Sequence, residues 1–292
     1  MCELLGLSSR KKITVNSYLR EFFSHSEIHC HGWGLALFYQ QAVSLEKEAI
    51  AANQSQYLHQ RIAHPIMIDN MIAHIRLASV GRMFYENCHP FVKHDNRGRS
   101  WTLAHNGTLF KAPHLDLFQS VQEGQTDSER ILYYLVDEVN KLQDELGWPL
   151  TPEERFRLLD DLITRLSVDN KLNLLLWDGE YMYVHTNYRG TLHLLRKDAE
   201  TCGLPPSRST TARGRPCPSC SCWSFARDDW SMKARVAARS ILIRKRTLNT
   251  STWILLICNG SAIHLYEAFG FVQIPGFSEQ FVRGDYLMAK GV

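Results

Sequence analysis

Four groups of polar residues in the first half of the chain could together cleave a side-chain amide. They are Cys2, the run His74 to Ser79, the run Asn87-Cys88-His89-Pro90, and His105-Asn106-Gly107 followed by Asp127. Cys2 becomes the first residue once Met1 is removed, which places a thiol beside its own α-amine. That amine has an ordinary pKa of about 8, so it can act as the general base for the attached nucleophile.

The other groups supply what attack by a thiol requires. Asn106 and Gly107 offer a side-chain amide and a backbone N–H to the oxyanion of a tetrahedral intermediate, and losing one such donor typically costs roughly 3 kcal/mol. Arg76 can pair with an α-carboxylate, and Asp127 can hold an α-ammonium group. The substrate indicated is therefore a free amino acid with a side-chain amide.

Each residue also has a purely structural interpretation. A cysteine near a terminus is usually a small buried hydrophobic residue, and Asn-Gly is usually a turn. Asp127 suits the first turn of a helix, and His74 and His89 suit structural hydrogen bonds. Only their occurrence together favours the catalytic interpretation.

The hydrophobic pattern predicts the elements that position these residues. Thr126 and Thr151 have the spacing of helix N-caps, and Asn106-Gly107 and Asp178-Gly179 are expected to be turns, the second within a hairpin. Strands are expected at 2–7, 33–39, 71–78, 101–104, 191–195 and 254–257, and helices at 15–23, after each cap and at 261–269. Strands without regular alternation with helices favour an α+β sandwich over a doubly wound sheet.

Bulk composition excludes several classes of function. The chain has 292 residues and a formal net charge of only +3, which gives no electrostatic argument for nucleic acid. It contains no run of eighteen apolar residues, so no membrane span is expected. Its first residues lack a signal-peptide pattern, and its eight cysteines are interpreted as thiols. A cytoplasmic protein is predicted.

Residues 201–238 differ from the rest, being rich in Pro, Ser, Arg and Cys, and we expect a linker or disordered segment there. Cys217, Cys220 and Cys222 invite a zinc interpretation, but no second Cys-x-x-Cys or His pair lies at finger distance. The basic residues nearby could contact nucleic acid, although such a run is more often simply solvated. Neither a metal nor a cofactor is therefore expected.

Residues 1 to about 196 resemble the class II glutamine amidotransferases, which are N-terminal-nucleophile hydrolases, and in particular their small stand-alone bacterial subgroup. The matching motifs, in the family's order, are MCELLGLSS, HGWGLALFY, AHIRLASVG, ENCHPF, WTLAHNGTL and GQTDSERILYYL. The resemblance implies a four-layer αββα fold and hydrolysis of glutamine to glutamate and ammonia. It assigns Cys2 as nucleophile and Asn106 and Gly107 as oxyanion hole. Arg76, Asp127, Ser79 and His89 are assigned to substrate binding.

The resemblance divides the chain into a domain at 1–200, the 201–238 segment, and a tail at 239–292. The 201–238 segment stands where the family has the last strands of the domain, so an incomplete domain is one expectation. The tail resembles part of a GNAT acetyltransferase, with Tyr266 in the position of that family's general acid, but it lacks the loop that binds acetyl-CoA. A rearrangement or frameshift would explain such a fragment. Two functions remain open: a hydrolase of glutamine or a γ-glutamyl compound, with or without a separate ammonia-accepting synthase, and an inactive binding or regulatory module.

Overall fold

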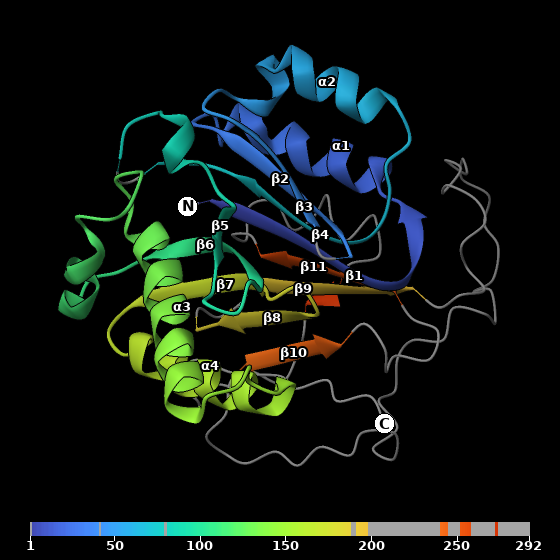
Figure 1. Ribbon diagram of the computed structural model, residues 1–292. Helices are drawn as coiled ribbons and strands as arrows, with labels where there is room; N and C mark the ends of the chain where they lie inside the picture. The colour runs from blue at the N-terminus through green and yellow to red at the C-terminus, as the bar shows by residue number, and fades with distance from the viewer. Residues whose placement is uncertain are drawn as a thin grey trace.

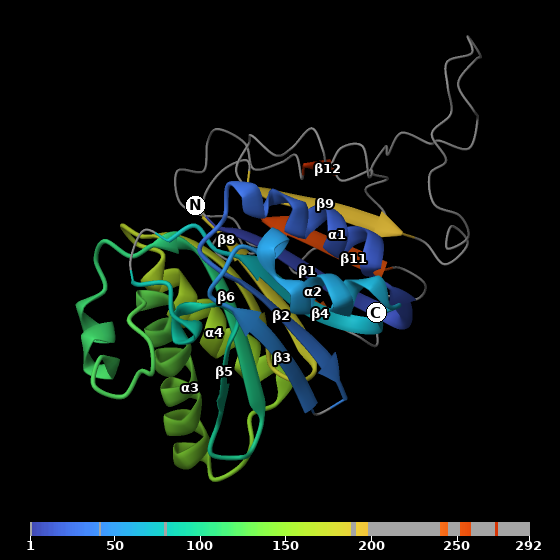
Figure 2. The same ribbon diagram turned by 90° about the horizontal axis from the view of Figure 1, so that it is seen from above.

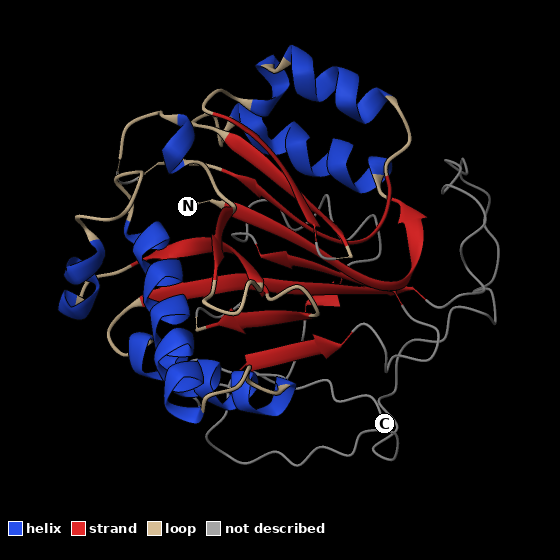
Figure 3. Ribbon diagram, in the orientation of Figure 1, coloured by secondary structure: helices blue, strands red, loops and turns tan. Residues whose placement is uncertain are grey.

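Two β-sheets lie face to face in the computed structural model, with helices covering their outer faces (Figures 1 and 3). The structure describes residues 2–40, 42–78, 81–187, 191–197, 240–244, 252–257 and 272–273. Helices α1 and α2 cover one sheet, and α3 and α4 cover the other. The four-layer αββα arrangement expected from the sequence is therefore confirmed.

The larger sheet has seven strands in the order β12-β9-β11-β1-β4-β2-β3. Figure 2 shows several of these strands beneath α1 and α2. Strand β1 lies in the middle, antiparallel to β4 on one side and to β11 on the other. The strands are β1 (Glu3–Thr14), β2 (Trp33–Tyr39), β3 (Ala42–Glu48), β4 (Met67–Ile75), β9 (Leu192–Lys197), β11 (Thr252–Ile257) and β12 (Val272–Gln273).

The smaller sheet has five strands in the order β10-β8-β7-β6-β5, all antiparallel to their neighbours. Strands β7 and β8 form the expected hairpin, whose turn contains Gly179 at φ 89°. The strands are β5 (Phe91–His94), β6 (Ser100–Thr108), β7 (Lys171–Trp177), β8 (Tyr181–Thr186) and β10 (Ser240–Arg244).

The long helices begin where the sequence predicts. The Thr126 hydroxyl accepts from the Glu129 N–H at the start of α3, and Thr151 forms a full capping box with Glu154 at the start of α4. At α3 the Glu129 carboxylate instead accepts from the N–H groups of the preceding loop. The helices are α1 (Asn16–Ser24), α2 (Gln56–Ala63), α3 (Asp127–Leu146) and α4 (Pro152–Leu166), with short 3-10 turns at His25–Glu27, Ala52–Gln54, Tyr85–Asn87 and Pro113–Phe118.

Alternation along the strands divides the core into three layers. In β1, Leu4 faces the other sheet, whereas Leu5 and Leu7 face α1. In β6, Ala104 lies between the sheets and Leu103 packs under α3 and α4. One side-chain position in two along each central strand therefore points into the space between the sheets.

Two expectations need correction. Asn106-Gly107 is not a turn: both residues lie within β6, opposite Asn173 and Leu172 of β7, because pairing with a neighbouring strand overrides the dipeptide's local preference. The acetyltransferase-like tail is not supported either. Its strands β10 and β11 pair within the two sheets, β11 between β1 and β9. Several other expectations concern residues outside the described ranges. These are the 201–238 segment with its cysteines considered for zinc, the helix expected at 261–269, and Tyr266.

Candidate active site

Three of the polar residues singled out above share the interior between the sheets. Side chains two positions apart in a strand lie on the same face. Cys2, His74 and Asn106 are each two positions from a residue of the apolar layer between the sheets, namely Leu4, Ile72 and Ala104. Strand β1, which follows Cys2, contacts β6 across this layer. The fold therefore brings together residues separated by more than a hundred positions in sequence.

Cys2 is partly buried and is held against the backbone just after β4. The Leu77 N–H lies 3.4 Å from Cys2 Sγ, and the thiol donates to the Leu77 carbonyl at 3.7 Å. Burial raises the pKa of the Cys2 thiol, whereas the chain's amino terminus and Arg76 act in the opposite direction. The thiol is therefore neutral at pH 7, and it needs a base at the moment of attack.

Arg76 is buried directly after β4, and its guanidinium organises the loop that follows. It donates to the carbonyl oxygens of Arg82 at 3.1 Å and Gly81 at 3.3 Å. The Arg76 backbone exchanges hydrogen bonds with the segment around His31, whose Nδ1 also accepts from the Ala78 N–H at 2.9 Å. His31, for which the sequence predicts no role, holds the chain beside Cys2. The predicted ligand Ser79 lies outside the described residues.

Three histidines connect the two sheets behind Cys2. His74 stacks on His89 with ring centroids 4.2 Å apart, and His89 Nδ1 accepts from the His105 N–H at 3.2 Å. Burial lowers the pKa of His74 and of His89 well below the usual value, and nearby cationic groups act in the same direction. Both imidazoles are therefore neutral at pH 7. They form the back wall of the site rather than a source of charge.

Asn106 has an unusual environment. Its side chain is buried, yet neither Oδ1 nor Nδ2 has a hydrogen-bond partner among the described residues. A buried amide without partners costs free energy, so such a group often marks a site that a ligand completes. Its backbone carbonyl accepts from Asn173 Nδ2 at 3.0 Å, which fixes the strand at this position.

Gly107 is required by close packing. A Cβ here would lie 1.9 Å from the Lys171 carbonyl oxygen and 2.5 Å from His105 Nε2. Backbone N–H groups alternate sides along a strand, so the Gly107 N–H points to the same edge as that of His105, away from β7. The described pairing of β5 with β6 ends at Leu103, so this edge is not covered by β5 at Gly107.

Asp127 is the first residue of α3, close to the end of β6. Its Oδ2 accepts from the Leu109 N–H at 3.3 Å, and its charge acts on His105 in the direction that raises the histidine's pKa. The dominant effect on His105 is burial, which lowers that pKa. His105 Nδ1 pairs with Ser128 Oγ at 2.8 Å. The sequence analysis assigned no specific role to this histidine, which ties β6 to the start of α3.

The loops around the site are joined by Asn87. Its Oδ1 accepts from the Gln125 N–H at 2.7 Å and its Nδ2 donates to the Arg82 carbonyl at 2.9 Å. A Cβ on Gly124 would lie 2.6 Å from Asn87 Oδ1, so glycine permits this approach. Asn87 belongs to the motif Asn87-Cys88-His89-Pro90, from which the sequence predicts no role for the asparagine.

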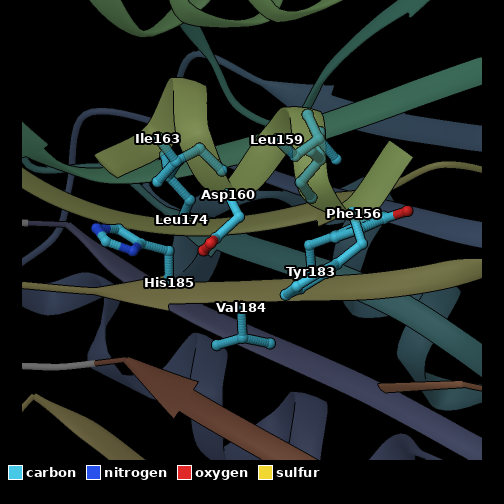
Figure 4. A pocket seen from close by; sticks show the side chains of 9 residues that line it. Phe156, Leu159, Asp160, Ile163, Leu174, Tyr183, Val184 and His185 are labelled. Carbon is cyan, nitrogen blue, oxygen red and sulfur yellow. The ribbon is translucent and has the colours of Figure 1, made fainter. Parts of the chain in front are cut away.

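A separate small hollow lies between α4 and strands β7 and β8 (Figure 4). Its lining is largely apolar apart from Asp160 and His185, and it includes none of the predicted site residues. Burial and the charge of Asp161 raise the pKa of Asp160 to about 6.

Within the described ranges, we find no group of three or more His, Cys, Asp or Glu side chains placed to hold a metal ion. The helices described there are too short or too polar to cross a bilayer.

Comparisons with known proteins agree on one family. The family model described as "Glutamine amidotransferases class-II" matches residues 1–200. An uncharacterised protein of Methanocaldococcus jannaschii is 36% identical over 199 residues, which cover 68% of this chain and 54% of that protein. The chain thus spans about half the length of that relative. The Escherichia coli protein named "Putative glutamine amidotransferase YafJ" is 29% identical over 216 residues, covering 68% of this chain and 82% of that protein.

Among solved structures, a predicted glutamine amidotransferase from Pseudomonas aeruginosa is similar with a TM-score of 0.50 and 20% identity. The match covers 87% of this chain and 88% of that chain, and at this identity it supports the fold alone.

Proposed function

Because this chain belongs to the class-II glutamine amidotransferases, we propose that it hydrolyses the side-chain amide of glutamine or of a γ-glutamyl compound, with Cys2 as the nucleophile. The observation that carries the proposal is the buried Asn106 amide. It lies in the same layer between the sheets as Cys2 and has no hydrogen-bond partner among the described residues. An oxyanion formed by attack of Cys2 on an amide would provide that partner.

The reaction begins when the α-amine freed by loss of Met1 takes the Cys2 proton. Sulfur then attacks the amide carbon, and its oxygen becomes an oxyanion that accepts from Asn106 Nδ2 and the Gly107 N–H. The protonated amine returns its proton to the leaving nitrogen, ammonia departs, and a thioester remains. Water, deprotonated by the same amine, then attacks the thioester to release glutamate and restore the thiol. A base in the same residue suits a thiol whose pKa burial has raised.

Substrate recognition is assigned to Arg76, Asp127, Ser79 and His89. Arg76 pairs with the α-carboxylate and Asp127 with the α-ammonium, which together select a free amino acid or an N-terminal γ-glutamyl group. Ser79 and His89 are assigned to the pocket lining on the family resemblance. Because burial keeps His89 neutral, its role is to shape the pocket and hold β6 rather than to transfer a proton.

The amidotransferase domain, on this proposal, comprises residues 1–200 together with β10 and β11, which pair within its sheets. For residues 201–238, between these parts, the proposal keeps the linker or disordered segment expected from the sequence. The ammonia is either released or passed to a separate synthase. A reactive free thiol suits the reducing cytoplasm.

The test measures ammonia release from glutamine by protein whose intact mass proves that Met1 is absent. Cys2→Ala should abolish release, while Cys30→Ser, which changes an exposed thiol, should retain it. Ammonia released by Cys2→Ala at the original rate would contradict the proposal. A protein that retains Met1 and is inactive would instead favour the binding or regulatory module. Screening γ-glutamyl compounds then identifies the substrate.

A further inference from the structure

Glu3, next to the nucleophile, has a buried carboxylate on the opposite face of β1. Its side chain follows the alternation of Leu5 toward the helix layer, and only 2% of Glu3 is exposed. Glu3 Oε2 lies 2.9 Å from His25 Nδ1, and Oε1 lies 4.0 Å from His29 Nε2. A carboxylate so deeply buried costs free energy unless charged or polar partners compensate it, and these histidines do so.

The same short segment also contacts the residues on the other side of Cys2. His25 ends α1, its N–H donating to the carbonyls of Phe22 and Phe23. A few residues later, His31 Nδ1 accepts from the Ala78 N–H, and the Gly32 carbonyl accepts from the Arg76 N–H at 2.8 Å. Residues 25–32 therefore contact both the strand that begins beside Cys2 and the segment that carries Arg76.

Such support matters because Cys2 lies beyond the strand pairing. The first pairs of β1 are Glu3 with Ile75 on one side and Leu4 with Ile257 on the other. Chain ends separate from a sheet readily, and a nucleophile displaced by about 1 Å can lose activity on the order of 100-fold. The contacts of the Glu3 side chain oppose this fraying from behind the sheet.

We propose that Glu3, acting through His25, is a positioning residue that holds Cys2 in register with Arg76. The inference rests on the proposed function, because Cys2 must be the nucleophile for its position to matter in catalysis. Glu3 touches neither the substrate nor the reacting atoms; its effect passes through the backbone it shares with Cys2.

The experiment compares Glu3→Gln, His25→Gln and the double variant with the original protein after Met1 removal. The isosteric change at Glu3 keeps the side chain's volume but removes its charge. Glu21→Gln is the matched control, because Glu21 Oε1 lies 3.9 Å from the other ring nitrogen of His25 and the Glu21 side chain is more exposed than that of Glu3. Two readouts are taken: kcat and KM for glutamine, and the rates at which iodoacetamide alkylates Cys2 and Cys88, resolved by peptide mass mapping.

Glu3→Gln should lower kcat by about 10-fold with KM within about 2-fold, because the nucleophile and not the substrate is displaced. Fraying should also expose the partly buried Cys2 thiol further, so alkylation of Cys2 should become faster while that of the buried Cys88 does not change. The double variant should lose no more activity than either single variant, because both changes break the same contact. Glu21→Gln should behave like the original protein.

Original rates of turnover and of Cys2 alkylation in Glu3→Gln would overturn the inference. So would equal acceleration at Cys2 and Cys88, since that pattern reports general loosening rather than local fraying. If the original protein releases no ammonia from glutamine, the proposed function fails, but the alkylation ratio of the two cysteines still decides whether Glu3 positions Cys2.

Discussion

The imidazole of His74 lies almost parallel to that of His89, at an interplanar angle of 23° with centroids 4.2 Å apart. His74 belongs to β4 of the larger sheet, and His89 precedes β5 of the smaller one, so the stack joins the two sheets. Burial lowers the pKa of both rings well below the usual value. The contact therefore depends on both rings remaining neutral.

This stack should make the fold sensitive to mild acid. A histidine whose folded pKa is depressed binds its proton mainly in the unfolded state, so stability falls as the pH drops below about 6.5. The slope is about 1.4 kcal/mol per pH unit for each such histidine. His74→Phe keeps an aromatic ring but cannot titrate, so urea unfolding between pH 4.5 and 6.5 should show a slope smaller by about that amount. His59→Gln is the control, because His59 is exposed. An equal loss of slope in both variants would show that the slope does not come from the buried His74.

Removing the Asn106 amide should affect turnover more than substrate binding. Asn106→Ala should lower kcat for glutamine by about 100-fold to 1,000-fold, because the oxyanion forms only in the transition state. KM should change little. Steady-state ammonia release measures both constants, and Asn53→Ala, at an exposed asparagine, should match the original protein. A large rise in KM at unchanged kcat would instead assign Asn106 to ground-state binding.

A buried ion pair should be essential for the smaller sheet. Arg155 Nε lies 2.7 Å from Asp178 Oδ2, and both side chains are almost completely buried. Arg155→Met should cost about 3–5 kcal/mol, because Asp178 is left as a buried charge whose remaining partners among the described residues are Tyr183 and backbone N–H groups. Arg165→Met on the same helix breaks an exposed pair of equal length with Asp161 and should cost less than about 1 kcal/mol. Equal losses in chemical denaturation would contradict this interpretation.

Asp160 should destabilise the protein at neutral pH. Its pKa is raised to about 6 from an ordinary value near 4, so the folded state retains a proton that the unfolded state releases. Stability therefore falls as the pH rises from about 4 to 6, and Asp160→Asn should recover about 1 kcal/mol at pH 7 after allowance for its partial exposure. At pH 3.5 the variant and the original protein should have the same free energy of unfolding. A gain that persists at pH 3.5 would indicate another cause.

Most of the local structure and the residue types of the site follow from short stretches of the sequence. Some features depend only on neighbours a few residues away, so short-range patterns in the sequence predict them. They are the helix caps at Thr126 and Thr151, the strand alternation around Leu4 and Ala104, and the hairpin at Gly179. The motifs that carry Cys2, Arg76, Asn106 and Asp127 were recognisable because each is continuous in the chain.

Which of these residues meet depends on how the whole chain folds. Asn106 and Gly107 lie in a strand rather than a turn because β7 pairs with them. Strands β10 and β11 enter the sheets from a tail whose motifs resemble another family. The stack of His74 on His89 and the contact of Glu3 with His25 join segments with no shared local pattern. Such contacts arise from packing two sheets and a helix layer, and packing is a property of the whole chain rather than of any window along it.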